Sequence, residues 1–245
     1  MSGDESRAQP DSAAPGLDWA RERGRGWRRH LDALEAMLAP VDEPIARALE
    51  LDRPLRIADV GCGGGGAAMA RTRRAPKGSA IHGFGVMFFD APSAAFANLR
   101  RWLAPEGRFA FAVWAPIEDN PWMKALRDTM ASHVSTPPPE PDAPGPFRYA
   151  PSERLISLLA AAGFDHLAAR DWRGELELGG GLGAEDAATF ALSSFSIAAA
   201  LNEAGAGIVD EARADLMSVF SAFEREGAVK MPARAHIVTG VAASG

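Results

Sequence analysis

The segment 56–66 constrains the fold of this chain more than any other stretch. It reads Arg-Ile-Ala-Asp-Val-Gly-Cys-Gly-Gly-Gly-Gly, a short apolar run that reaches an acid and then becomes almost pure glycine. An Ala-rich stretch of helical character, 67–74, follows it. Glycine permits positive φ and lets a ligand approach the backbone without meeting a Cβ. A helix N-terminus adds unpaired N–H groups and the positive end of a dipole. The order strand, tight turn, helix therefore predicts a ligand-binding βα turn.

Two glycine fingerprints overlap in this segment. The first, Gly61-x-Gly63-x-x-Gly66, satisfies the dinucleotide pattern, which also needs an acid about 20 residues further on to bind the ribose. Around position 81 the chain reads Ser-Ala-Ile-His-Gly-Phe, which contains no acid. The missing acid disfavours an NAD(P) oxidoreductase.

The second fingerprint places the acid before the glycines, as Asp59-x-Gly61-x-Gly63-x-Gly65. It resembles motif I of the class I S-adenosylmethionine (SAM)-dependent methyltransferases. The leader, which contains Trp and Arg, resembles that of their quinone-biosynthesis-like type. The resemblance implies that Asp59, Gly61, Cys62, Gly63 and Gly65 hold the amino-acid end of SAM, the acid often through water. It also implies SAM as the cofactor and a small-molecule substrate, such as a quinone precursor or another secondary metabolite.

The block 84–114 carries the second part of this resemblance. The apolar run Gly83–Asp90 predicts a buried parallel strand. Asp90 is then expected to cap a helix with Pro92 in its first turn. The sequence Ala-Pro-Glu-Gly at 104–107 predicts a turn into a further strand, 108–114. Strand, helix, Pro-x-Gly turn and strand are similar, in order and spacing, to the fourth strand through the fifth strand of the family.

The connection between the glycine turn and this block is short. The resembled family has two further βα units there, of about 30 residues each. Residues 66–83 hold one helix and at most a short piece of strand. We therefore predict an internal deletion of roughly 50 residues, which removes strands two and three together with the ribose-binding acid. The deletion leaves an exposed edge on the first strand, which the leader, the short piece of strand or a second copy of the chain could cover.

The predicted fold class is α/β: a Rossmann-like class I methyltransferase fold with a mostly parallel, truncated sheet and extra helices at the C-terminal side. Residues 1–16 are expected to be a disordered tail, and 17–245 a single methyltransferase-like domain. Two segments, 117–150 and 179–228, are predicted to be substrate-side insertions. The remaining predicted elements are a helical leader broken at Pro40, helices 153–162 (capped by Ser152), 185–203 and 208–226, and strands 166–178 and 235–241.

Four further features have alternative interpretations. Trp27 belongs either to a leader that packs on the sheet or to a lid over the cofactor. Tyr149 follows the Pro-rich segment 136–146 and is a candidate substrate contact. His82 is either a strand-end histidine or a base that faces the pocket. The glycine run 179–183 is either a flexible turn or an anion site at a helix N-terminus, although two acids in that helix's first turn argue against an anion.

Composition excludes several classes of function. The net charge of −6 and pI near 5.4 disfavour a non-specific nucleic-acid binder. Cys62 is the only cysteine, so an intrachain disulfide is impossible and a reducing, cytoplasmic setting is expected. The five histidines show no metal-ligand spacing. No apolar run reaches the length of a membrane span, and the N-terminal residues lack the apolar region of a secretory signal.

These features predict a SAM-dependent methyltransferase acting on a small molecule, with cofactor binding impaired by the deletion. The alternative is a catalytically inactive methyltransferase remnant that acts by self-association or by binding a partner. A homodimer through the exposed sheet edge is the corresponding prediction for assembly.

Overall fold

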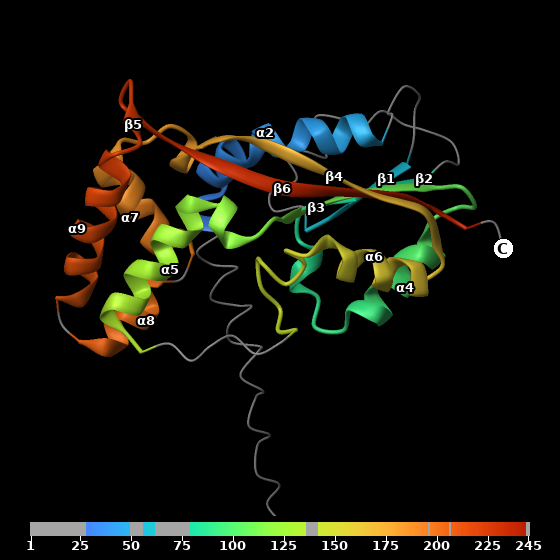
Figure 1. The fold of residues 1–245 in the computed structure, drawn as a ribbon, viewed down its shortest axis with the longest axis horizontal. Coiled ribbons are helices and arrows are strands. Elements are labelled where there is room, and N and C mark those ends of the chain that lie inside the picture. Colours follow the sequence, from blue (N-terminus) through green and yellow to red (C-terminus); the bar gives the residue numbers. More distant parts are fainter. Residues whose placement is uncertain are drawn as a thin grey trace, which may run out of the picture.

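The fold is α/β, with one mixed sheet and helices on both of its faces (Figure 1). The computed structural model describes residues 28–49, 56–61, 79–135, 142–195, 197–205 and 207–243. Within these ranges the six-stranded sheet has the order β1-β2-β3-β6-β4, and β5 pairs with β6 alone. The strands are β1 (Arg56–Val60), β2 (Ser79–Gly83), β3 (Arg108–Trp114), β4 (Phe164–Glu177), β5 (Glu224–Arg225) and β6 (Ala228–Ala242).

The sheet has a parallel half and an antiparallel half. Strands β1, β2 and β3 are parallel neighbours, whereas β6 runs antiparallel to both β3 and β4. Parallel strands need helical or other long connections that cross over the sheet, and α4 (Pro92–Trp102) supplies one between β2 and β3. This confirms the predicted Rossmann-like α/β class, with the parallel part confined to three strands.

The two faces of β3 are covered by different helices. Phe111 contacts Phe96 of α4, and Phe109 lies against Phe164 beside α6 (Ser152–Ala161). Ala110 and Ala112 alternate with these rings and therefore project to the other face. Small side chains there let α2 (Leu31–Ala48) lie close to the sheet, on the face opposite α4 and α6 (Figure 1).

Helix α2 forms because of tertiary packing, and in spite of its prolines. The sequence predicted a break at Pro40, but the helix runs through both Pro40 and Pro44. A proline inside a helix removes one hydrogen bond and costs about 3 kcal/mol. The buried stripe Leu34, Met37, Val41 and Ile45 has helical spacing and is almost fully enclosed. Its burial outweighs the proline penalty, because each large side chain contributes about 1.5–3 kcal/mol.

Four helices gather at the end of the sheet where β3 finishes (Figure 1). They are α5 (Pro121–His133), α7 (Ala184–Ser194), α8 (Ile197–Ala204) and α9 (Ile208–Ser221). We call this group the helical cap. The short helix η2 (Ile117–Asp119) leads from β3 into it, and η3 (Leu178–Gly180) leads from β4 into it. The cap is built from the two segments that were predicted to be insertions.

Several predicted boundaries were wrong. The helix expected at 185–203 is two helices, α7 and α8, and α9 ends at Ser221, short of the predicted 226. The last strand is much longer than 235–241 and accommodates Pro232 in its interior. Neither Asp90 nor Ser152 caps its helix, since the cap positions are Ala91 and Pro151 and neither makes a side-chain cap bond.

The largest correction concerns the strand predicted at 83–90. The strand ends at Gly83, and residues 86–88 form the short helix η1 (Val86–Phe88). The piece at 79–83, which was expected to be a marginal strand, is β2, and it pairs with both β1 and β3. The earlier turn is imposed by contacts with β1: a Cβ on Gly83 would lie 2.3 Å from the carbonyl oxygen of Val60. Apolar character alone did not reveal this close approach.

Within the described residues, no helix is long and apolar enough to cross a membrane. The same part of the chain contains no group of three or more His, Cys, Asp or Glu side chains arranged to hold a metal ion.

The close approach at Gly83 leads to a prediction about stability. Gly83→Ala forces its new methyl group against the Val60 backbone, so we expect the free energy of unfolding to fall by about 1–3 kcal/mol. Gly145→Ala is the matched control, because its Cβ would have only the Ala143 carbonyl oxygen near it, at 3.9 Å. Urea unfolding of both variants measures the difference. Equal stabilities for the two variants would contradict the contact.

Candidate functional site

The carboxyl ends of β1 and β2 bring an acid and a histidine together. Asp59 and His82 are register partners in the parallel ladder, so their side chains share one face of the sheet. The Asp59 Oδ2 atom lies 3.4 Å from His82 Nε2, and the two side chains are 10% and 6% exposed. Ligands of open α/β sheets bind outside the carboxyl ends of the parallel strands. The pair therefore marks the candidate site.

Gly61, the first glycine of the fingerprint, makes a structural contact of its own. Its φ is +77°, in the left-handed region, which costs a residue with a Cβ about 1–2 kcal/mol. A Cβ on Gly61 would also lie 3.1 Å from the Cα of Gly85, in the turn that follows β2. Two glycine turns therefore touch directly at the carboxyl edge. This contact explains why both positions need glycine, whether or not a ligand is bound.

The structure places three of the seven residues predicted for the site. Asp59 and Gly61 lie together at the carboxyl end of β1, and Tyr149 lies in the segment before α6. The other four lie outside the described residues, and their predicted roles remain predictions: Trp27, Cys62, Gly63 and Gly65. His82, considered as a base from the sequence, is buried against Asp59 at the strand end.

Tyr149 is fully buried, so its surroundings govern its chemistry. Burial raises the pKa of its hydroxyl, and the nearby Arg148 guanidinium partly offsets that rise. The Arg148 guanidinium carbon lies 5.6 Å from the centre of the Tyr149 ring. Among the described residues, the hydroxyl oxygen has no hydrogen-bond partner. Whether this tyrosine contacts a substrate stays a prediction.

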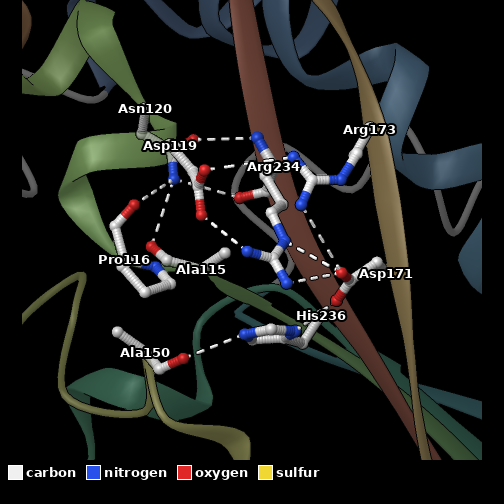
Figure 2. A network of polar contacts seen from close by, with 9 residues as sticks. All are labelled: Ala115, Pro116, Asp119, Asn120, Ala150, Asp171, Arg173, Arg234 and His236. Atoms are coloured by element: carbon white, nitrogen blue, oxygen red, sulfur yellow. Dashed lines mark hydrogen bonds and ion pairs between the residues drawn. The ribbon is translucent and has the colours of Figure 1, made fainter.

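A polar network joins the helical cap to the sheet (Figure 2). Asn120, fully buried at the start of α5, donates from Nδ2 to the carbonyl oxygens of Ala115, Pro116 and Arg234, at 3.1 Å each. The side-chain Oδ1 of Asn120 accepts a hydrogen bond from the backbone N–H of Arg234 at 3.1 Å. The side-chain amide of Asn120 thus binds backbone groups of both β6 and the segment that follows β3. These hydrogen bonds hold the chain in place where it leaves β3 for the helical cap.

The side chain of Arg234 continues the network across β6. Its guanidinium donates to Asp119 at 2.6 Å and to Asp171 of β4 at 2.9 Å. These two hydrogen bonds raise the pKa of Arg234, Asp119 contributing most. Burial alone would raise the pKa of Asp171, but hydrogen bonds from Arg234 and His236 reverse that effect and lower it. Arg173 lies 3.9 Å from both carboxylates.

His236 connects this network to the segment that carries Tyr149. Its Nδ1 lies 2.8 Å from the Asp171 carboxylate, and its Nε2 lies 2.9 Å from the carbonyl oxygen of Ala150 (Figure 2). Both partners are acceptors only, so the two contacts are both hydrogen bonds only when each ring nitrogen carries a proton. The arrangement is a structural tie between β6, β4 and residue 150, on the sheet face opposite Asp59.

The second glycine run does not form a free anion site. It ends at Gly183, the N-cap of α7. The first N–H of that helix, at Ala184, donates to the carboxylate of Glu224 at 3.0 Å. A protein carboxylate therefore already occupies the position that an anion would take. This favours the interpretation of the run as a turn.

Sequence analysis missed two contributors to this region. Gly85 was assigned to a strand, although the spacing Gly83-x-Gly85 within an apolar run signals a close backbone approach. Trp122 belongs to none of the motifs found in the sequence, yet its ring lies against Trp114 at the end of β3, with centroids 5.3 Å apart. No local pattern distinguishes a tryptophan that faces the strand ends from one that faces another helix.

Comparisons with known proteins add distant likenesses. No protein-family model matches the sequence, and no curated protein matches it. Among solved structures, the chain is similar to a candidate methyltransferase of Bacillus halodurans, at 9% identity and a TM-score of 0.44, over 82% of this chain and 99% of that one. It is also similar to the YcgJ protein of Bacillus subtilis, at 16% identity and a TM-score of 0.43, over 82% and 100%. The (4+2)-cyclase SpnF matches at 13% identity and a TM-score of 0.39, over 84% and 80%. These likenesses are too distant to carry an argument about function.

The lowered pKa of Asp171 leads to a prediction about acid stability. A carboxyl whose folded pKa is depressed stabilises the protein above its unfolded pKa, about 3.9, and that contribution is lost as the pH falls through the folded value. We therefore expect wild type to be more stable than Asp171→Asn at pH 6, with the difference shrinking below about pH 4. Urea unfolding of both proteins across this range measures it. A stability difference that does not change with pH would contradict the assignment.

Proposed function

We propose that the chain is a SAM-dependent methyltransferase of the class I type that acts on a small molecule in a cytoplasmic setting. One observation supports this above all: an almost buried acid, Asp59, lies near the carboxyl end of β1, two residues before Gly61, whose backbone is left-handed. A carboxylate there is a suitable partner for the ammonium group of SAM, and the Cβ-free turn allows close approach to the cofactor. When bound, SAM supplies an electrophilic methyl group.

The chain's own contribution to the reaction would be to hold the nucleophile and the methyl donor in the right positions. Methyl transfer from a sulfonium mainly requires the nucleophile in line with the methyl carbon, so orientation accounts for most of the rate. The helical cap lies beyond the end of β3, on the side to which the parallel strands point their carboxyl ends, where it could exclude water and hold the acceptor (Figure 1).

We further propose that the chain lacks the second and third βα units of the family. In the described residues β1 is paired only with β2, and β2 leads through η1 into α4, as the fourth strand of the resembled family does. A site without the ribose-binding acid loses two to four hydrogen bonds. At about 0.5–1.5 kcal/mol for each hydrogen bond, this loss lowers the affinity for SAM by one to several powers of ten.

His82 adds a constraint on the cofactor's amino-acid end. Its Nε2 already lies within ion-pair distance of the Asp59 carboxylate. A cofactor ammonium must therefore share Asp59 with the imidazole or displace it. This competition is a second physical reason to expect weak binding.

Calorimetric titration with S-adenosylhomocysteine, which keeps the amino-acid end of SAM, tests the proposal. We expect weak binding that Asp59→Asn reduces about 10-fold or more, because a charge-assisted hydrogen bond contributes about 1.5–3 kcal/mol. Asp165→Asn, an exposed acid at the opposite end of the sheet on β4, is the control and should not change the affinity. No heat at millimolar ligand, with the protein folded, would contradict the proposal. Heat with NADH instead would favour an oxidoreductase.

The alternative function is that of an inactive remnant that associates through β1. The observation that favours it is the position of β1, which has a ladder on one side only among the described residues. An unpaired strand edge is a template for pairing with another chain. Sedimentation velocity over a wide concentration range should then reveal a homodimer whose fraction increases with the protein concentration. A clean monomer at the highest concentration would exclude association through this edge.

A further inference from the structure

His236 is held between two hydrogen-bond acceptors on different parts of the chain. Its Nδ1 lies 2.8 Å from a carboxylate oxygen of Asp171, on β4, and its Nε2 lies 2.9 Å from the carbonyl oxygen of Ala150 (Figure 2). The residue is 8% exposed, so water has little access to replace either partner. A neutral imidazole carries one N–H group, whereas an imidazolium carries two. Only the protonated ring can therefore make both hydrogen bonds.

Loss of one proton would affect the two contacts of His236 unequally. The remaining N–H would stay on Nδ1, because a hydrogen bond to a carboxylate is stronger than one to a neutral carbonyl group. Nε2 would then turn its lone pair toward the carbonyl oxygen of Ala150, and two acceptors at 2.9 Å repel each other. Histidine changes its charge in the range of about pH 5 to 8. Rising pH therefore weakens the contact with Ala150 first.

The charged groups of the sheet and of η2 act on the ring in both directions. The Asp171 carboxylate favours the imidazolium, whereas Arg234 on β6 and Arg173 on β4 oppose a further positive charge. Arg234 is hydrogen-bonded to Asp119 of η2 and to Asp171. Arg173 lies 3.9 Å from both of these carboxylates. The charges of the two arginines are therefore largely compensated by other partners, and the two direct acceptors of the ring favour its protonated form.

The segment 142–150, which ends at this contact, brings three ionisable side chains of its own. Asp142 is paired with Arg154 of α6. Arg148 donates a hydrogen bond to a carbonyl group at the end of η1. Tyr149 is buried, which raises the pKa of its hydroxyl although Arg148 partly offsets the rise, so it stays neutral over the range in which histidine titrates. Among the described residues of this segment, no carboxylate competes with Asp171 for the ring.

The segment 142–150 is also hydrogen-bonded to the turn that follows β2. The backbone N–H of Gly145 donates to the carbonyl oxygen of Met87 at 3.3 Å, and the Arg148 side chain donates to the carbonyl oxygen of Phe89. The segment therefore has one attachment to η1 and a second, through His236, to the antiparallel half of the sheet.

This position connects the segment to the candidate site. The N-cap of η1 is Gly85, the glycine that packs against Gly61 after β1. A change in how the segment 142–150 is held would thus be felt one contact away from the glycine turns.

We propose that His236 is a pH-sensitive tie for the segment 142–150. The protonated ring holds the Ala150 end of the segment to β6 and β4, and the neutral ring releases it. The segment is then attached through η1 alone and becomes more mobile beside the turn at Gly85. The tie contributes its full stabilisation at low pH and loses it as the pH rises. This inference depends on the contacts of His236 and not on the proposed function.

Hydrogen exchange, followed by mass spectrometry between about pH 5.5 and 8.5, tests the tie. The reporting amides are those of Gly145, Arg148 and Ala150, which donate to the carbonyl oxygens of Met87, Gly145 and Phe147. After correction for the intrinsic exchange rate at each pH, we expect their protection to fall about 10-fold or more from the low to the high end. This is the effect of losing one hydrogen bond from a charged donor.

Three variants show whether His236 causes the change. His236→Gln cannot gain a charge, so its protection should no longer depend on pH. His166→Asn is the control, because His166 is exposed on β4 and has a φ of +52°, which asparagine tolerates. It should keep the wild-type profile. Asp171→Asn removes the carboxylate that favours the imidazolium, so the loss of protection should begin at lower pH. This variant keeps the tie testable if His236→Gln does not fold.

Nitrogen-15 signals of the His236 ring give a second measurement on the wild-type protein. We expect both ring nitrogens to carry a proton at about pH 5.5 and only Nδ1 to carry one at about pH 8.5. A ring with a single protonated nitrogen at the low end would overturn the tie. Protection of the segment that does not change with pH, or that changes equally in His236→Gln, would overturn it as well. Titration of the same proteins with S-adenosylhomocysteine tests the proposed function separately, since either result can fail without the other.

Discussion

Strand β6 is the element on which the rest of this structure depends. It is hydrogen-bonded to β4 and to β3 on its two sides, in both cases antiparallel. Its side chains also carry the polar network, because Arg234 reaches Asp119 before the helical cap and Asp171 on β4. An interior strand of this length cannot shift register without exposing its buried face. The parallel strands and the cap are therefore both held against one fixed element.

The candidate site follows from where the parallel strands end. Strands β1, β2 and β3 point their carboxyl ends at the cap, and Asn120 fixes the chain as it leaves β3. The buried Asp59–His82 pair and the contact between the rings of Phe84 and Trp114 lie on this same edge. The proposed methyl transfer would need the donor and the acceptor held in line at this edge more than it would need acid–base groups.

The small size of the parallel half limits the proposed chemistry. Among the described residues only three strands are parallel, and the glycine turn follows the outermost of them, β1. Part of the polar surface of Asp59 is already engaged by His82, and Gly61 is already in contact with Gly85. Some of the residues that would bind a cofactor are therefore also needed for the fold. This double use connects cofactor affinity to the stability of the β1–β2 pair.

Much of the architecture was determined by the sequence alone. The apolar runs of β1 and β3 and the amphipathic repeat of α6 are local patterns, and each appeared close to its predicted place. The acid before the glycine turn could also be identified from the sequence, because a carboxylate is unusual at the end of an apolar strand. The tertiary structure alone decided the end of β2 at Gly83, the continuity of α2 through Pro40, and the contacts of Asp59 with His82 and of Trp122 with Trp114. These features depend on backbone and side-chain contacts between segments far apart in the chain, which composition and periodicity do not encode.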